Sequence, residues 1–439
     1  MSQAPKQRGL AIPTGRLNRM IRFSGMTAAV AGNMAVNGGV ELLSGTRPKL
    51  RDLLLTPSNA ARVADHLARM RGAAMKAGQL LSMETQDLLP AEISQILGRL
   101  RAEAHVMPPS QLKRVLIANW GQTFLKQFES FNVHPIAAAS IGQVHRARTA
   151  DGRDVVVKVQ YPGIRDSIDS DMRNLGALLR ASNMVPDEFD LNRLMEDARK
   201  QLHEETDYRR EAEALRRFGR HLENRDGFVV PSVQDDLSTD DILTMTFLNG
   251  LPIENVATMD QSTRDSVAER VLTLMLYEVF VLRDVQTDAN FANYRYDPIE
   301  DRVILLDFGA TRQFDATLTA ACLRMLKTMV TGARGEVIDQ LVEIGLIGPD
   351  LSSADRAELL KLFDIASEPF RQGGVFEFGN SDLLPRLRYA GFDLAKAQVA
   401  MHAPPTDVLF LQRKVLGCYL LAERLGARVD LDQLLRPYL

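Results

Sequence analysis

One pattern of polar residues around an apolar segment constrains this chain more than any other feature. Asn293 follows Asp288 by five residues, and the apolar run at residues 303–306 then leads directly into Asp307-Phe-Gly. A short apolar run predicts a buried strand, so Asp307 should stand where that strand ends. Carboxylate and amide oxygens suit Mg²⁺, a hard ion that keeps part of its hydration shell. The spacing therefore predicts a magnesium site.

Asp-x4-Asn, a strand and Asp-Phe-Gly follow one another in this order in protein kinases, where they surround the ATP phosphates. On this interpretation Asp307 holds the Mg²⁺ that bridges the β and γ phosphates, and Asn293 binds a second Mg²⁺. Asp288 accepts a hydroxyl proton or orients a water molecule. We therefore expect a kinase-like enzyme with ATP and Mg²⁺ as cofactors.

A lysine upstream extends this interpretation to the nucleotide. Lys158 stands inside an apolar strand pattern at residues 155–161, where a buried ammonium needs a partner. A long helical pattern covers residues 187–220, and on it Glu205 continues an apolar stripe. Glu205 is therefore the expected partner of Lys158. Lys158, Glu205 and Asp288 are the predicted catalytic residues.

The phosphate-covering loop of kinases follows the pattern G-x-G-x-x-G-x-V. In this chain the register fits, but Ala137 and Ala139 replace the first two glycines. Met245 and Phe247 belong to the segment expected to link two lobes. The predicted nucleotide-binding residues are Ala137, Ala138, Ala139, Ser140, Gly142, Val144, Lys158, Met245 and Phe247.

Two departures from protein kinases bear on the substrate. Gln286-Thr287 precedes Asp288, where protein kinases have His-Arg. A helical pattern resumes near Asp315, which leaves almost no activation segment after Asp307. Because protein kinases dock their peptides on that segment, a folded protein substrate would have no obvious platform here.

Composition sets further bounds. The 439 residues, of which 45% are hydrophobic, suffice for a two-lobed enzyme with a substantial core. The formal net charge of −3 argues against nucleic acid as a partner. Cys322 and Cys418 lie far apart in the sequence, which indicates neither a disulfide framework nor a zinc site.

The N-terminal segment is basic and then uncharged. Five cations between Lys6 and Arg22 precede the first acidic residue, Glu41, and residues 24–40 carry no charge. The uncharged stretch is too weakly apolar to predict a membrane-spanning helix. Two interpretations stay open: a helix that lies on an anionic membrane or against a partner helix, and an ordinary surface helix.

Several motifs together resemble the UbiB family of atypical kinases, the AarF-domain-containing kinases, and most closely its coenzyme Q biosynthesis branch. The similarity covers roughly residue 16 to the C-terminus. The motifs are Lys76-Ala-Gly78-Gln79, the alanine-rich loop from Ala137 to Val144, Glu205-Thr206-Asp207, Gln286-Thr287-Asp288 with Asn293, and Asp307 to Arg312.

The resemblance implies an α+β fold: an atypical protein-kinase-like, two-lobed fold with an N-terminal helical extension and a mostly helical C-lobe. The expected domains are a basic, mildly apolar segment (1–45), a helical region with the Lys-x-Gly-Gln motif (46–130), an N-lobe with inserted helices (131–247) and a C-lobe (248–439). The resemblance also implies a gating motif over the peptide site, formed by Lys76, Gln79, Glu205 and Asp207. Thr246 departs from the branch, where a Glu is usual, so the nucleotide preference stays open.

The same resemblance implies an ATPase or small-molecule kinase that supports ubiquinone biosynthesis. The expected partners are a lipophilic quinone precursor or phenolic lipid, an anionic membrane surface, other quinone-biosynthesis enzymes and a second copy of the chain. Two alternatives are a protein kinase acting in trans and a nucleotide-binding scaffold. An Arg-rich and Ala-rich composition favours a cytoplasmic protein peripheral to a bacterial inner membrane, with the mitochondrial matrix face as the alternative.

Overall fold

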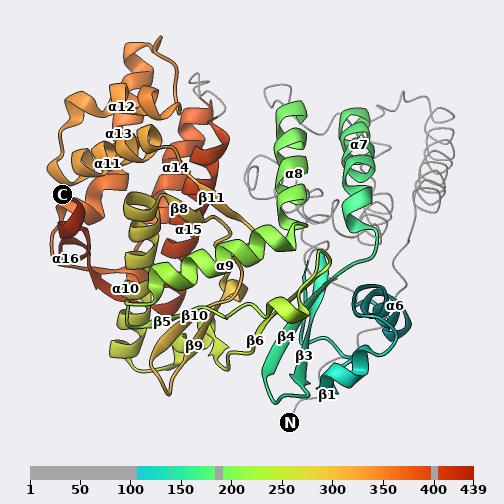
Figure 1. Cartoon of the computed structure of the whole chain (residues 1–439). Helices are drawn as coiled ribbons and strands as arrows, with labels where there is room; N and C mark the ends of the chain where they lie inside the picture. Colours follow the sequence, from blue (N-terminus) through green and yellow to red (C-terminus); the bar gives the residue numbers. More distant parts are fainter. Residues whose placement is uncertain (1–105, 140, 183–190, 397–403) are drawn as a thin grey trace, which may run out of the picture. The chain divides into compact units, whose positions relative to one another are not determined.

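The computed structural model describes residues 106–139, 141–182, 191–396 and 404–439 (Figure 1). The chain divides into two compact units: the first runs to Glu213 and includes Ser232–Phe247, and the second comprises Ala214–Pro231 and Leu248–Leu439. The expected segment 1–45 and most of the region 46–130 lie outside the described residues. The expected domain division therefore stays a prediction.

An antiparallel sheet forms the centre of the first unit. Its strand order is β1-β3-β4-β6, with β2 paired to β3. Valines alternate along the central strand β4, and Val155, Val157 and Val159 are completely buried, as suits β-branched side chains on a pleated surface. A turn at Asp151-Gly152 joins β3 to β4, so the two strands form a hairpin. The strands are β1 (Phe128–Phe131), β2 (Ala137–Ala138), β3 (Gly142–Thr149), β4 (Asp154–Gln160) and β6 (Ile242–Thr246).

Helices accompany this sheet in the sequence: α6 (Pro109–Trp120), α7 (Ile164–Ser182), α8 (Leu191–Glu205) and α9 (Tyr208–Leu222). The long helix expected over residues 187–220 is in fact two helices, α8 and α9. Asp207 separates them, because its Oδ1 accepts hydrogen bonds from the N–H groups of Arg209 and Arg210, each at 3.1 Å. A side-chain oxygen in this position caps the start of a new helix.

The second unit is mostly helical. Short strands form a four-stranded sheet in the order β5-β10-β9-β7 and two two-stranded ladders, β8 with β11 and β12 with β13. Its helices are α10 (Gln261–Tyr277), α11 (Ala316–Thr331), α12 (Val337–Ile344), α13 (Ser353–Arg371), α14 (Leu383–Lys396), α15 (Thr406–Leu425) and α16 (Leu431–Leu435). Its strands are β5 (Phe228–Val229), β7 (Leu251–Pro252), β8 (Asp284–Gln286), β9 (Tyr294–Asp297), β10 (Arg302–Leu305), β11 (Thr311–Gln313), β12 (Val375–Glu377) and β13 (Arg428–Asp430).

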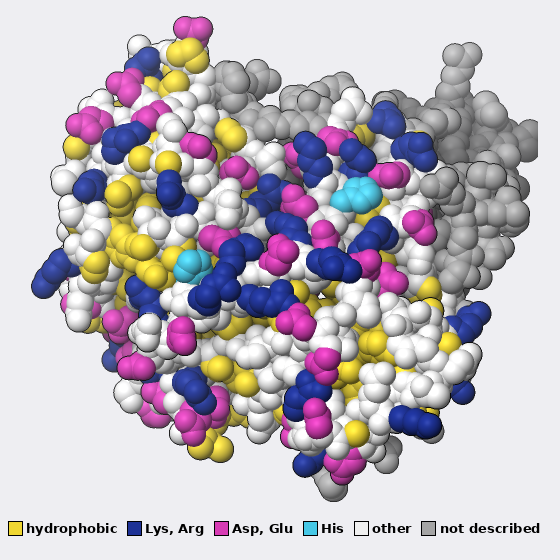
Figure 2. Space-filling view, viewed as in Figure 1, with side chains coloured by type: hydrophobic (Ala, Val, Ile, Leu, Met, Phe, Trp, Pro, Cys, Tyr) yellow, Lys and Arg dark blue, Asp and Glu magenta, His cyan; other side chains and the backbone are white. Residues whose placement is uncertain are grey.

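Both units combine helices with sheets, which confirms the expected α+β class. Figure 2 shows positive and negative side chains interleaved over the face in view. Within the described parts of the chain, we find no helix that is both long enough and apolar enough to cross a membrane.

Candidate active site

Lys158 lies on β4 in the first unit and forms a buried ion pair. Its Nζ is 2.5 Å from Oε1 of Glu211, and the two side chains are 10% and 3% exposed. Removing one partner from such a pair would leave an uncompensated buried charge, which costs about 3–5 kcal/mol. Glu211 therefore holds the ammonium of Lys158 in a defined place.

Glu211 is thus a partner of Lys158 that was not predicted, and the expected pairing of Lys158 with Glu205 stays a prediction. Glu205 is the last residue of α8, and its Oε1 accepts a hydrogen bond from Nε2 of Gln201 at 3.2 Å. Glu211 lies in the first turn of the next helix, α9. The prediction assumed one continuous helix, whereas Asp207 caps a new helix from which Glu211 reaches Lys158. An Asp followed by a fresh amphipathic pattern was the signal in the sequence.

The alanine-rich loop is a tight hairpin. Ala137 and Ala138 of β2 pair with Val144 and Gln143 of β3, and the N–H of Ala139 donates to the carbonyl of Gly142 at 2.8 Å. Ser140 lies outside the described residues.

Gly142 is required by the packing of the strands. A Cβ at this position would stand 2.5 Å from the carbonyl oxygen of Val159 and 3.0 Å from the hydroxyl of Tyr208. Glycine here allows β3 to approach β4 closely, which is a reason separate from any contact with phosphate.

The segment expected to link the lobes forms its backbone hydrogen bonds with other residues of the first unit. Met245 is buried and pairs with Val156 of β4. The N–H of Phe247 donates to the carbonyl of Asp154 at 2.9 Å, so this N–H already has a hydrogen-bond acceptor within the first unit. Thr246, in the place of the usual Glu, accepts a hydrogen bond from the N–H of Ser232 on its hydroxyl at 2.8 Å. Thr246 therefore anchors this end of β6.

Asp288 and Asn293 meet directly in the second unit. Nδ2 of Asn293 donates to Oδ2 of Asp288 at 3.2 Å and to the carbonyl of Asp288 at 3.1 Å. The amide nitrogen faces Asp288, so the amide oxygen, Oδ1, is the atom with which Asn293 could bind a metal ion.

Asp307 follows β10 and lies beside this loop. The N–H of Leu306 donates to the carbonyl of Asn293 at 2.9 Å, and both Asn293 and Asp307 line one small pocket. Oδ1 of Asp307 accepts a hydrogen bond from the N–H of Gly309 at 3.0 Å. The next residue, Phe308, is buried with its ring 4.6 Å from that of Phe218. The second unit thus brings together the three residues predicted from their spacing.

Gln286 and Thr287 have a role that the sequence did not reveal. Nε2 of Gln286 donates to the carbonyl of Asp307 at 3.1 Å, and the hydroxyl of Thr287 donates to the carbonyl of Ala310 at 2.7 Å. These two side chains bind the backbone at each end of the Asp-Phe-Gly segment. They hold this segment in place. Protein kinases have His-Arg at the two positions that Gln286 and Thr287 occupy here.

The segment after Asp307 is short, as predicted. Thr311 already pairs with Gln286 in the β8–β11 ladder, and α11 begins at Ala316. Asp315 caps this helix by accepting a hydrogen bond from the N–H of Thr317 at 2.7 Å.

The three residues fit a magnesium ion by their chemistry. Asp288 and Asp307 supply carboxylates and Asn293 supplies an amide oxygen, and hard divalent cations take such ligands together with phosphate oxygens and water. Among the described residues no group of three or more His, Cys, Asp or Glu side chains could hold a metal by itself. A site completed by phosphate oxygens does not need such a group.

The gating motif is described only in part. Lys76 and Gln79 lie outside the described residues. Between Glu205 and Asp207, the carbonyl of Thr206 accepts hydrogen bonds from Nε2 of Gln160 at 2.6 Å and from Nη2 of Arg165 at 2.7 Å.

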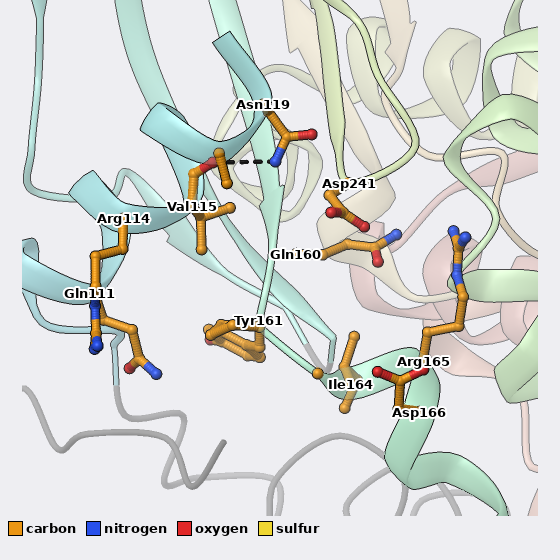
Figure 3. A pocket seen from close by; sticks show the side chains of 13 residues that line it. Gln111, Arg114, Val115, Asn119, Gln160, Tyr161, Ile164, Arg165, Asp166 and Asp241 are labelled. Carbon is orange, nitrogen blue, oxygen red and sulfur yellow. Dashed lines mark hydrogen bonds between the residues drawn. The ribbon is translucent and has the colours of Figure 1, made fainter. Parts of the chain in front are cut away.

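Gln160 and Arg165 also line a pocket of about 400 Å³, to which α6 and the start of α7 contribute side chains (Figure 3). This pocket is in the first unit, and Lys158 is not among its lining residues. Convergence of Lys158 and Glu205 with Asp288, Asn293 and Asp307 on one nucleotide stays a prediction.

Residues 99–341 match the ABC1 atypical kinase-like domain. The chain belongs to the ABC1 family of atypical kinases. It is 35% identical to the mitochondrial atypical kinase COQ8 of Saccharomyces cerevisiae, over 97% of this chain and 85% of the relative. It is 32% identical to the mitochondrial atypical kinase COQ8B of Rattus norvegicus, over 97% of this chain and 80% of the relative. The resemblance to the UbiB family is thereby confirmed.

A solved structure supports the fold. The complex of Rv3197 with erythromycin, from Mycobacterium tuberculosis, matches with a TM-score of 0.60 over 87% of this chain and 96% of that chain. The sequence identity is 24%, so the likeness concerns the fold alone. The fold of this ABC1 chain is kinase-like, with sheets and many helices, and membership of a kinase-like family implies ATP binding.

Proposed function

We propose that this chain is a magnesium-dependent atypical kinase or ATPase that supports ubiquinone biosynthesis. In this proposal it binds Mg-ATP and acts on, or helps to extract, a lipophilic quinone precursor or phenolic lipid at a membrane. The observation that carries it is the contact between Asn293 and Asp288, which holds the amide that we propose as a metal ligand beside the candidate base. The similarity to COQ8 and COQ8B supports the link to coenzyme Q.

Each residue has a defined task in this proposal. Bound Mg²⁺ would neutralise negative charge on the phosphates, and Asp307 and Asn293 would hold it. Lys158, oriented by Glu211, would pair with phosphate oxygens. Asp288 would accept the proton of an attacking hydroxyl or orient a water molecule.

The short segment after Asp307 favours a small acceptor over a folded protein. Thr311 pairs with β8 only four residues after Asp307, so little chain remains to bind a peptide. Protein kinases use a long segment here, and its phosphorylation controls their activity. A protein kinase acting in trans is therefore the weaker alternative.

We place the protein at a membrane surface. The proposed location is the cytoplasmic face of a bacterial inner membrane, and the mitochondrial matrix face is the alternative, since the relatives carry mitochondrial names. The basic N-terminal segment is the proposed contact with anionic lipid. Other quinone-biosynthesis enzymes and a second copy of the chain are further proposed partners.

ATP consumption by the purified full-length chain tests this function. We expect Mg²⁺-dependent turnover that rises when cardiolipin-containing liposomes or a phenolic amphiphile are added. Asp307→Asn should lower turnover by at least about a hundredfold, because a neutral amide binds Mg²⁺ more weakly. Asp350→Asn, at an exposed position, is the matched control and should behave as wild type.

Quinone content decides between the alternatives. In a strain that lacks the protein, Asp307→Asn should fail to restore ubiquinone if turnover is required. Restoration by Asp307→Asn would favour the nucleotide-binding scaffold. Transfer of labelled phosphate to a partner protein, together with no response to lipid, would favour the protein kinase.

A further inference from the structure

We propose that helix α15 is a template that positions the catalytic loop and the Asp-Phe-Gly segment, with Gly417 and Lys414 as positioning residues for ATP turnover. The inference rests on the proposed function, because it concerns the same residues of the second unit. Helix α15 spans Thr406–Leu425 and lies outside the 99–341 match to the family domain.

The helix presents one face to this region. Asp407, Phe410, Lys414 and Gly417 are spaced by three, four and three residues, which places them on one side of an α-helix. Figure 1 shows α15, in red, beside the β8 and β11 strands. Phe410 belongs to the same buried apolar cluster as Val285 of β8.

The first turns of this face hold β11. Oδ1 of Asp407 lies 3.4 Å from Nη1 of Arg312, and the guanidinium carbon of Arg312 lies 4.3 Å from the centre of the Phe410 ring. Arg312 belongs to the strand that continues from the Asp307 segment. An ion pair and a cation–π contact on one guanidinium fix the direction of that strand.

The middle of this face holds the residue after Asn293. Nζ of Lys414 lies 3.1 Å from the hydroxyl of Tyr294 and 2.9 Å from Oε2 of Glu278. The side chains of Lys414 and Glu278 are each 1% exposed. Glu278 begins the π-helical turn Glu278–Leu282, which leads to β8. A buried pair with a third polar partner tolerates little movement, because each group loses its compensation when displaced.

The last part of this face touches the residue after Asp288. A Cβ added to Gly417 would stand 2.1 Å from the Cβ of Ala289, 3.2 Å from its carbonyl oxygen and 3.4 Å from its Cα. Glycine inside a helix costs about 1 kcal/mol relative to alanine, so the helix alone would favour alanine here. The contact with Ala289 explains the glycine.

One helix therefore contacts the residues that follow Asp288 and Asn293 and the strand that follows Asp307. A rigid element that touches all three segments sets their spacing. Displacement of a catalytic group by about 1 Å can reduce a rate by about a hundredfold, so this spacing governs turnover.

Gly417→Ala in the full-length chain tests the inference. The added methyl group must push Ala289 and hence Asp288. We expect the kcat of Mg-ATP turnover to fall by at least about tenfold, with the KM for ATP changed by less than about twofold. Thermal unfolding serves as the check that the variant is folded.

A second substitution should reverse the effect. Ala289→Gly removes the atom at 2.1 Å and leaves the carbonyl oxygen at 3.2 Å and the Cα at 3.4 Å, so the loop has to give by only a few tenths of an ångström. Gly417→Ala combined with Ala289→Gly should therefore recover kcat to within about threefold of Ala289→Gly alone. Gly391→Ala, on α14, is the control, because a Cβ there would meet nothing within 4 Å.

Amide hydrogen exchange gives a readout without nucleotide. Gly417→Ala should speed exchange over residues 284–294, and the double variant should restore protection. If Gly417→Ala does not fold, Tyr294→Phe replaces it: the loss of the hydroxyl that contacts Lys414 should speed exchange over the same residues.

The outcomes separate the two proposals. Unchanged kcat and unchanged exchange in folded Gly417→Ala would overturn the template role. So would a loss of activity that Ala289→Gly does not relieve. A wild-type chain without Mg-ATP turnover would overturn the proposed function instead, and exchange would still decide whether α15 positions the loop.

Discussion

Nζ of Lys158 on β4 lies 2.5 Å from Oε1 of Glu211 on α9, and the pair is buried within the first unit. The same helix continues to Phe218, whose ring contacts that of Phe308. Glu211 thus pairs with the candidate phosphate-binding lysine in the first unit, and Phe218 packs on the Asp-Phe-Gly segment in the second unit.

Glu211→Gln should damage both stability and turnover. It removes the negative charge 2.5 Å from the buried ammonium of Lys158, so we expect the free energy of unfolding to fall by about 3–5 kcal/mol. Chemical denaturation and ATP turnover check this. Glu213→Gln, at an exposed position on the same helix, is the control. Equal stability of the two variants would show that the ion pair does not hold Lys158.

Thr287→Val should loosen the Asp-Phe-Gly segment. Thr287 is completely buried, and valine keeps its shape while removing the hydrogen bond to the carbonyl of Ala310. The carbonyl of Ala310 keeps the N–H of Thr287 as a donor at 3.3 Å, so the loss is that of one hydrogen bond, about 0.5–1.5 kcal/mol. We expect a corresponding loss in denaturation experiments and reduced turnover. Thr317→Val, in the exposed first turn of α11, should change neither quantity by a comparable amount.

Gly142→Ala should destabilise the first unit, because its Cβ would clash with the backbone of Val159. Overpacking of this kind typically costs about 1–3 kcal/mol. Gly219→Ala, where a Cβ meets nothing within 4 Å, should be neutral or slightly stabilising. A melting temperature unchanged by Gly142→Ala would contradict the packing explanation.

The stability of the first unit should depend on pH through His145. Burial lowers the pKa of this imidazole from 6.5 to about 4, and the ring bonds to the carbonyl of Asn132 and the amide of Gln143. The unfolded chain therefore binds a proton more readily. The stabilisation is complete above about pH 6.5 and is lost as the pH falls toward 4.

Unfolding measured between pH 7 and 4 tests this dependence. His145→Gln should flatten the pH profile relative to wild type. His134→Gln, which changes an exposed histidine, should leave the profile as it is. A profile that His145→Gln does not alter would contradict the assignment.

The sequence predicted the second-unit residues because the information was local. Asp288, Asn293 and Asp307 flank one short β-hairpin, so their spacing and the apolar run were enough to place them together. The short segment after Asp307 followed from the helical pattern near Asp315 in the same way.

What the sequence missed depends on distant contacts or on a helix break. Glu211 was missed because Asp207 starts a new helix. Gln286 was noted only as a difference from the protein-kinase pattern. Its role was missed because its hydrogen bond goes to the backbone carbonyl of Asp307, which a sequence pattern does not show. Lys414 was not predicted to be buried. It is buried because Glu278, far away in the sequence, faces it.

Nucleotide binding by the purified full-length chain, measured by calorimetry with and without Mg²⁺, shows whether Asp307 and Asn293 hold the metal ion. We expect that wild type binds ATP more tightly with Mg²⁺ and that Asp307→Asn and Asn293→Ala lose this enhancement. Control titrations use Asp350→Asn. If both site variants keep the full enhancement by Mg²⁺, then Asp307 and Asn293 do not hold the metal and the account is contradicted.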